Sequence, residues 1–259
     1  MTDRGARAGG RGTTPAPGAG TPTGISIHVA VNDCAASRAS GYPALEGCLA
    51  DAQAMQDLAA AAGFEPRLIT GAAATGEPVV EAIRGAGPRV GANGLLLLTF
   101  SGHGARIRDR STLSGWRYGW SLHDRVLMND ELAHAWAEFP AGARVLVLSD
   151  SCFSGELFRG VRGAARPSTD AAGGDAAPAP RASVWLLFLS AAEDNEGAAD
   201  GTPHGAFTQA LLDVWDRGAF EGDYVELHAE IYRRLMLLQH PVIRAWPSPG
   251  FARQRPFTI

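Results

Sequence analysis

The chain has 259 residues, which suits one large domain or a domain with appendages, and its hydrophobic content of 46% is enough to fill a core. A net charge of −4 without a basic cluster argues against nucleic acid as the main partner. No apolar stretch approaches the roughly 18 residues needed to span a bilayer, so no membrane partner is expected.

The N-terminal segment and the cysteine content each predict a property of the protein. Residues 1–23 are rich in Gly, Ala, Pro, Thr and Arg and lack the apolar segment of a signal peptide, which predicts a disordered tail before a folded domain at residues 24–259. Cys34, Cys48 and Cys152 cannot form a closed disulfide framework. A reducing compartment fits this cysteine usage, so we expect a cytoplasmic protein.

Short apolar runs alternate with helical patterns along the rest of the chain, which predicts a doubly wound α/β sheet. The strands are expected at residues 25–31, 66–70, 94–101, 144–149 and 184–189, with an edge strand within residues 241–259. The helices are expected at residues 44–62, 77–84, 129–139 (capped by Asn129), 206–215 and 224–238.

Two segments interrupt this alternation. Residues 102–124 contain three arginines within five residues and two tryptophans without a clear periodicity, so a long irregular loop is expected there. Residues 160–181 are rich in Ala, Gly, Pro and Asp and cannot pack, so they are expected to form a flexible linker.

Polar residues follow two of the apolar runs directly. Residues 99–104 (TFSGHG) come after four leucines, and residues 149–155 (SDSCFSG) come after Val-Leu-Val-Leu. Ligands bind at the carboxyl ends of strands in such sheets, and a right-handed strand-helix-strand unit would set the two ends side by side. His103 and Cys152 then have the arrangement of a base and a cysteine nucleophile.

These motifs resemble the caspase-like clan of cysteine peptidases, and most closely its metacaspase and bacterial caspase-homologue branch. The resemblance rests on residues 101–104, 150–155 and 45–52 (LEGCLADA), with weaker support from residues 190–200 and 205–208. The 49-residue separation of His103 and Cys152 is also close to the spacing in caspase-type peptidases. The resemblance implies a bacterial protein with an α/β/α sandwich around a central, mostly parallel six-stranded sheet.

The resemblance also implies a reaction. Cys152 attacks the scissile carbonyl as thiolate, and His103 is the acid/base that protonates the leaving amine. The backbone N–H groups of Cys152 and Gly104 are expected to hold the oxyanion, where small residues let the substrate approach closely.

A specificity follows from three further positions that match the metacaspase pocket for the residue before the cut bond (the S1 pocket). Asp51 and Asp150 supply two carboxylates and Ser101 a polar wall. Two facing carboxylates repel, and a bidentate guanidinium relieves the repulsion, so cleavage after Arg is expected, with Lys tolerated. The alternative is that Asp51 is a solvated helix residue and Asp150 a turn former.

The sequence departs from the calcium-dependent members of the branch. Asp109, Asp124 and Asp130 are present after the His-Gly motif, but Arg159 stands where an acidic ligand is expected after the nucleophile. We therefore expect no metal cofactor, and activity without calcium or under the control of another signal.

The expected partner is a protein substrate with a basic residue before the cut bond, in limited proteolysis. Activation would come from a separate partner protein or from self-cleavage in the linker, for which Arg162 is the best candidate because Gly163 follows it. Two alternatives stay open: a catalytically silent caspase-like regulatory domain, and a thiol enzyme of another class, such as an acyl transferase.

Overall fold

The computed structural model describes residues 23–34, 43–112, 115–152, 184–193, 197–247 and 249–259. Residues 1–22 of the expected tail and the whole expected linker at 160–181, including Arg162, lie outside the described residues. Within them no helix is long and apolar enough to cross a membrane.

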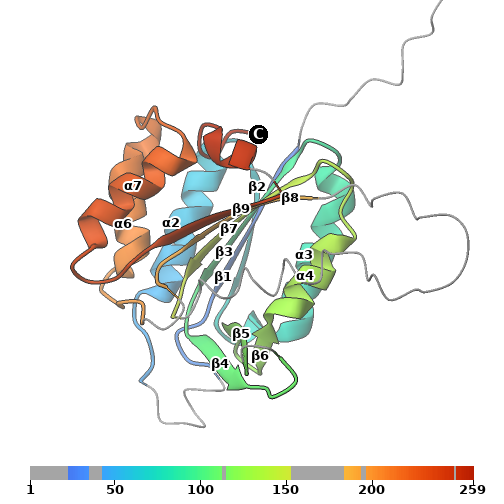
Figure 1. Ribbon diagram of the computed structural model, residues 1–259, viewed down its shortest axis with the longest axis vertical. Coiled ribbons are helices and arrows are strands. Elements are labelled where there is room, and N and C mark those ends of the chain that lie inside the picture. The colour runs from blue at the N-terminus through green and yellow to red at the C-terminus, as the bar shows by residue number, and fades with distance from the viewer. Residues whose placement is uncertain (1–22, 35–42, 113–114, 153–183, 194–196, 248) are drawn as a thin grey trace, which may run out of the picture.

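A six-stranded sheet runs through the centre of the molecule in the order β2-β1-β3-β7-β8-β9 (Figure 1). Neighbours from β2 to β8 pair in parallel, and β9 runs antiparallel to β8 at the edge. The expected sheet and its edge strand are thus confirmed. The strands are β1 Gly24–Ala30, β2 Glu65–Thr70, β3 Leu95–Ser101, β7 Arg144–Asp150, β8 Trp185–Ser190 and β9 Val242–Trp246.

Helices cover both faces of this sheet, which makes an α/β/α sandwich (Figure 1). On one face lie α2, α6 and α7, and on the other α3 and α4. Every residue of β1 and β3 is buried, as expected for strands that are covered on both sides. The helices are α2 Cys48–Ala61, α3 Gly76–Val90, α4 Asn129–Ala137, α6 Ala206–Trp215 and α7 Tyr224–Leu235, with 3-10 turns at Gly71–Ala73, Asp216–Gly218 and Pro249–Arg253.

Helix bounds differ from expectation where packing outweighs local sequence. Helix α3 continues past the expected end at residue 84 to Val90. Its last turns pack closely on Phe139, because a Cβ at Gly87 would lie only 2.8 Å from the Phe139 ring. Helix α2 starts at Cys48 rather than at residue 44, and α7 ends at Leu235 rather than at residue 238. Asn129 is the first residue of α4 rather than its cap.

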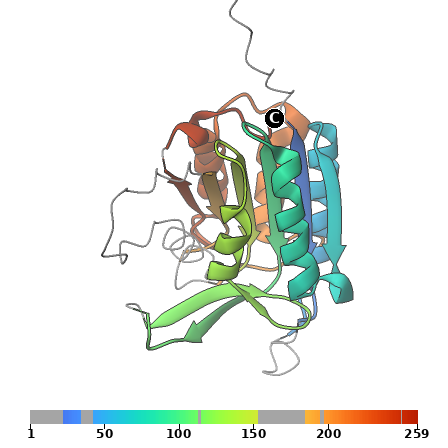
Figure 2. The same cartoon turned by 90° about the vertical axis from the view of Figure 1, so that its right-hand side faces the viewer.

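The expectation of an irregular loop at residues 102–124 is wrong. This segment contributes to a second, antiparallel sheet of β4 (Gly104–Arg108), β5 (Trp116–Ser121) and β6 (Val126–Met128), at the carboxyl end of the parallel strands (Figure 2). Trp120 fastens it to the main sheet, since its ring stacks on Phe100 at 4.6 Å and its Nε1 donates to Ser149 Oγ at 3.0 Å. These anchors are contacts between distant residues, which a local pattern does not contain.

Candidate active site

The register of β3 and β7 brings the two polar strand ends together. Ser101 pairs with Asp150 at the last position of the two strands. His103 and Cys152 each follow two residues later, so both lie just beyond the carboxyl ends of these neighbouring strands. The contact of Gly104 with Cys152 is so close that a Cβ at Gly104 would lie 1.8 Å from the Cys152 carbonyl oxygen. Glycine is therefore required there by the approach of the two backbones.

A backbone carbonyl orients the His103 ring. Its Nε2 lies 3.0 Å from the carbonyl oxygen of Pro43, which can only accept, so Nε2 carries a proton. In the neutral ring Nδ1 then holds the lone pair that a general base needs. A loop before α2 thus fixes the tautomer of the candidate base.

Cys152 differs from the other two cysteines in exposure. Cys34 and Cys48 are buried, and burial raises the pKa of the Cys48 thiol to about 12, so Cys48 stays protonated at neutral pH. Cys152 is partly exposed, and the backbone N–H of Ala198 donates to its Sγ at 3.3 Å. Of these three, Cys152 is the one that combines access to solvent with a backbone N–H donor to its sulfur.

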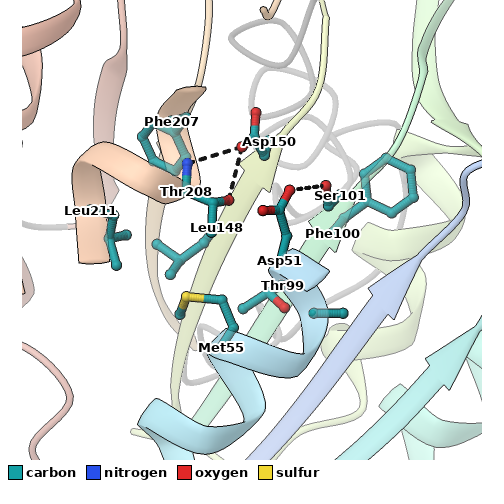
Figure 3. Close-up of a pocket in the computed structure, with 11 residues that line it drawn as sticks. Asp51, Met55, Thr99, Phe100, Ser101, Leu148, Asp150, Phe207, Thr208 and Leu211 are labelled. Atoms are coloured by element: carbon teal, nitrogen blue, oxygen red, sulfur yellow. Dashed lines mark hydrogen bonds between the residues drawn. The ribbon is translucent and has the colours of Figure 1, made fainter. Parts of the chain in front are cut away.

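Asp51 comes from α2 and is buried, with 2% of its surface exposed, so the alternative of a solvated helix residue is wrong. Its carboxylate accepts from Ser101 Oγ at 2.6 Å and from the Gly205 N–H at 3.2 Å, and His204 Nδ1 lies 3.0 Å from Oδ1. Figure 3 shows Asp51 and Ser101 facing each other across the end of β3.

Asp150 ends β7 and turns its carboxylate to the start of α6 (Figure 3). Oδ2 accepts from the N–H of Thr208 at 3.0 Å and from its Oγ1 at 2.8 Å. A Cβ at Gly205 would lie 2.6 Å from Asp150 Oδ2 and 3.2 Å from Asp51 Oδ2, so both carboxylates converge on this glycine. The N-terminus of α6 stabilises negative charge at this position.

Burial and nearby negative charges disfavour the charged forms of this pair. Burial raises the pKa of Asp51 to about 6. The pKa of Asp150 rises to about 7 because it is buried and because Asp51 is beside it. A bound cation would reverse both effects, since it neutralises the pair where water cannot.

The nucleophile and one carboxylate of the acidic pair, that of Asp150, line a pocket with a cavity volume of about 80 Å³. Its walls include His103, Cys152, Ser101 and Asp150. A second, smaller cavity of about 10 Å³ is lined by Asp51 and shares Ser101 and Asp150 with the first (Figure 3). The structure therefore brings together the sequence-predicted residues from three segments of the chain.

The structure adds residues that the sequence motifs did not assign. Asp200 lines the same pocket and accepts from the N–H groups of Glu46 and Gly47 at 3.0 and 3.4 Å. His204 and Thr208 support the two carboxylates. Asp200 and Thr208 fall in segments that carry weak family resemblance and His204 lies between these segments, but the roles of all three depend on contacts across 58 to 154 positions of sequence.

The three aspartates considered as calcium ligands have protein partners here. Asp109 accepts from Ser111 at 2.9 Å, Asp124 from the Gly76 N–H at 3.0 Å, and Asp130 from Arg117 at 2.6 Å. Within the described residues no group of three or more His, Cys, Asp or Glu side chains is placed to hold a metal ion.

Comparison with protein families matches residues 33–249 to the caspase domain. The chain belongs to the caspase-domain family. Among solved structures, this caspase-domain protein is similar to protein GSU0716 from Geobacter sulfurreducens, with 32% identity, a TM-score of 0.75, and coverage of 92% of this chain and 99% of that one. No curated protein matches it.

Caspase-1 from Spodoptera frugiperda shares the fold at 14% identity and a TM-score of 0.59, with 86% of each chain covered. The six-stranded, mostly parallel sheet flanked by helices is thus the caspase fold. The family is one of cysteine peptidases, and the predicted membership of the caspase-like clan is confirmed.

Proposed function

We propose that this caspase-domain protein is a cysteine endopeptidase of the metacaspase branch that hydrolyses peptide bonds after arginine, with lysine tolerated. The observation that carries the proposal is a pocket in which a partly exposed cysteine and an oriented histidine lie beside Asp150 and Ser101, and the buried Asp51 accepts a hydrogen bond from that serine. A nucleophile alone would suit many thiol enzymes. The acidic pair beside it is what selects a cationic side chain as the substrate feature.

In the proposed reaction, the Cys152 thiol gives its proton to His103 Nδ1 and its sulfur attacks the scissile carbonyl carbon. The oxyanion that forms is held by the backbone N–H groups of Gly104 and Cys152. Collapse of this intermediate breaks the C–N bond, and His103 returns the proton to the leaving amine. Water then hydrolyses the thioester, which releases the acid and regenerates the thiol.

The proposed S1 pocket uses Asp51, Asp150 and Ser101. A guanidinium can bond both carboxylates at once because its N–H groups form a planar fork. Gly205, where both carboxylates converge, has no side chain that would fill the space. An aspartate in this pocket would add a third negative charge to a pair that already repels, so cleavage after Asp is disfavoured.

A matched set of peptides tests the specificity. Peptides that differ only in Arg, Lys, citrulline or Asp before the cut bond are compared by kcat/KM. Citrulline keeps the shape of arginine without its charge. Arg is expected to be cleaved fastest and Lys second, whereas faster cleavage of the Asp peptide contradicts the proposal.

A covalent probe separates the peptidase from a silent regulatory domain. An arginyl peptide with a thiol-reactive group should label Cys152 in wild-type protein and should fail to label a His103→Ala variant. Labelling without turnover of any peptide would instead favour a thiol enzyme of another class. Absence of labelling in the wild type would favour a silent domain.

Regulation of the proposed peptidase is expected to be independent of calcium, and to depend on an activating partner protein or on self-cleavage after Arg162. The intact mass of wild-type protein beside Cys152→Ala tests self-cleavage, because only the active protein can cut itself. Loss of activity on addition of a calcium chelator would contradict the first expectation.

A further inference from the structure

Gln239 is a fully buried glutamine that belongs neither to the candidate dyad nor to the acidic pair. It lies in the turn between α7 and β9, and both ends of its amide are used. Nε2 donates to the carbonyl of Ala191 at 3.0 Å, and Oε1 accepts from the N–H of Ala199 at 2.7 Å. The side chain thus joins the end of β8 to a segment that returns to the pocket.

That segment, residues 197–200, contacts several parts of the site. The Ala198 N–H donates to Cys152 Sγ at 3.3 Å. The Ala199 carbonyl accepts from the first N–H of α6, that of Ala206, at 3.0 Å. Asp200 accepts from backbone N–H groups just before α2. Gln239 is therefore bonded to Ala199, whose neighbour Ala198 donates to the nucleophile and whose carbonyl accepts from the first residue of α6.

Gln239 is itself held firmly. Its backbone N–H donates to the Leu235 carbonyl at 2.8 Å at the end of α7. Two residues later, the Pro241 carbonyl lies 3.0 Å from Nε2 of His228. The next residue begins β9, where Val242 pairs with Ser190 of β8. An amide fixed to two neighbouring elements can act as a rigid support for a segment without regular structure.

We propose that Gln239 is a positioning residue that holds the Ala198 N–H on the sulfur of Cys152. Because an N–H that donates to sulfur stabilises negative charge there, removal of the support should slow the reaction of this sulfur with an electrophile. The inference rests on the proposed role of Cys152 as nucleophile. A buried glutamine that only fills space would affect stability but not the reactivity of a cysteine that it does not touch.

Alkylation of Cys152 by iodoacetamide is the test, because it reports the thiolate without any peptide being cleaved. The sulfur displaces iodide, and peptide mapping identifies the modified cysteine, with Cys152→Ala as the blank. For Gln239→Met, which is similar in length and loses both hydrogen bonds, we expect alkylation at pH 7 to slow by about three- to tenfold and its pH profile to shift upward.

Gln254→Met is the matched control. Gln254 is half-buried and its Oε1 accepts from Arg144 at 2.8 Å, far from the segment at residues 197–200, so its loss should lower stability without changing the alkylation profile. Gln239→Glu keeps an acceptor for the Ala199 N–H and, when ionised, loses the donor to Ala191. Its rate is expected between those of wild type and Gln239→Met.

A folded Gln239→Met protein with the wild-type alkylation profile overturns the inference. If that variant does not fold, Gln239→Glu decides the matter, and a wild-type profile in it overturns the inference equally. Slower alkylation in a protein that cleaves no arginyl peptide would uphold the positioning role while the proposed function fails. Arginyl cleavage with unchanged alkylation would do the reverse.

Discussion

The candidate dyad and the acidic pair are built differently although Asp150 of the pair lines the same pocket as the dyad. Cys152 and His103 leave the sheet on loops and are partly exposed. Asp51 and Asp150 are 2% and 8% exposed, and they accept from the N–H groups of Gly205, just before α6, and of Thr208 in its first turn. The reacting groups are thus accessible, while the groups proposed to choose the substrate are buried and oriented before it arrives. Burial raises the carboxyl pKa values, so we expect the pH dependence of specificity to come from the acidic pair.

The largest expected effect comes from removing the dyad alone. Cys152→Ala should abolish cleavage, and His103→Ala should lower kcat by about 10³-fold or more, because the acid/base is lost. Binding of an arginyl peptide should survive in Cys152→Ala, since the acidic pair is intact. Fluorescence anisotropy with a labelled peptide measures this, and loss of binding would show that the two regions are not separable.

Neutralising one carboxylate of the acidic pair should weaken the binding of an arginyl peptide and leave the nucleophile reactive. Asp150→Asn should lower kcat/KM for an arginyl peptide by about 100-fold, mainly through KM, because a buried charge partner is lost. Cys152 should still be alkylated at the wild-type rate. Asp57→Asn, an exposed aspartate on α2, is the control and should leave kcat/KM unchanged. Equal losses in both variants would contradict the assignment of the pocket.

The same variant should gain stability at alkaline pH. A carboxyl group whose pKa rises on folding binds more protons in the folded state, so folding stability falls as the pH rises from about 4 to about 7. Asp150→Asn removes the part of this slope that comes from Asp150 and should be more stable than wild type at pH 8, by on the order of 1–3 kcal/mol. Urea unfolding at pH 5 and pH 8 measures the difference, and a larger wild-type stability at pH 8 would contradict it.

The pH profile of specificity should follow the acidic pair. Protonated carboxyl groups do not attract a cation, so preference for Arg should weaken as pH falls through about 7 and then about 6. The ratio of kcat/KM for Arg and citrulline peptides isolates this effect, because any change in the dyad cancels. We expect the ratio to fall by about tenfold between pH 8 and pH 5.5. A ratio that stays constant over this range would contradict the assignment of the arginine preference to Asp51 and Asp150.

The smallest expected effect concerns the support of Asp51. His204→Ala should raise KM for arginyl peptides by about three- to tenfold with kcat unchanged, because Asp51 loses one of its neighbours while Ser101 and Gly205 still hold it. His204→Asn keeps a donor at a similar position and should restore most of the loss. A fall in kcat alone would assign His204 to the dyad instead.

The sequence was sufficient where local pattern and chain order carry the information. Short apolar runs with polar ends predicted the strands, and Ser101, Asp150, His103 and Cys152 follow from those ends once parallel pairing is assumed. Their catalytic and specificity roles stay predictions. Residues 102–124 were predicted wrongly because the tryptophan that anchors the second sheet donates a hydrogen bond to Ser149 on β7, a strand that comes later in the chain.

Tertiary structure alone decided which further residues surround the site. Asp200 lies in a segment of weak family resemblance and His204 and Gln239 in none, and each acts through a hydrogen bond to a residue 40 to 154 positions away. A sequence states which groups are available and which faces they occupy. Whether an amide or a carboxylate is buried, oriented and shifted in pKa depends on the distances that the packed elements impose, and these exist only in the folded chain.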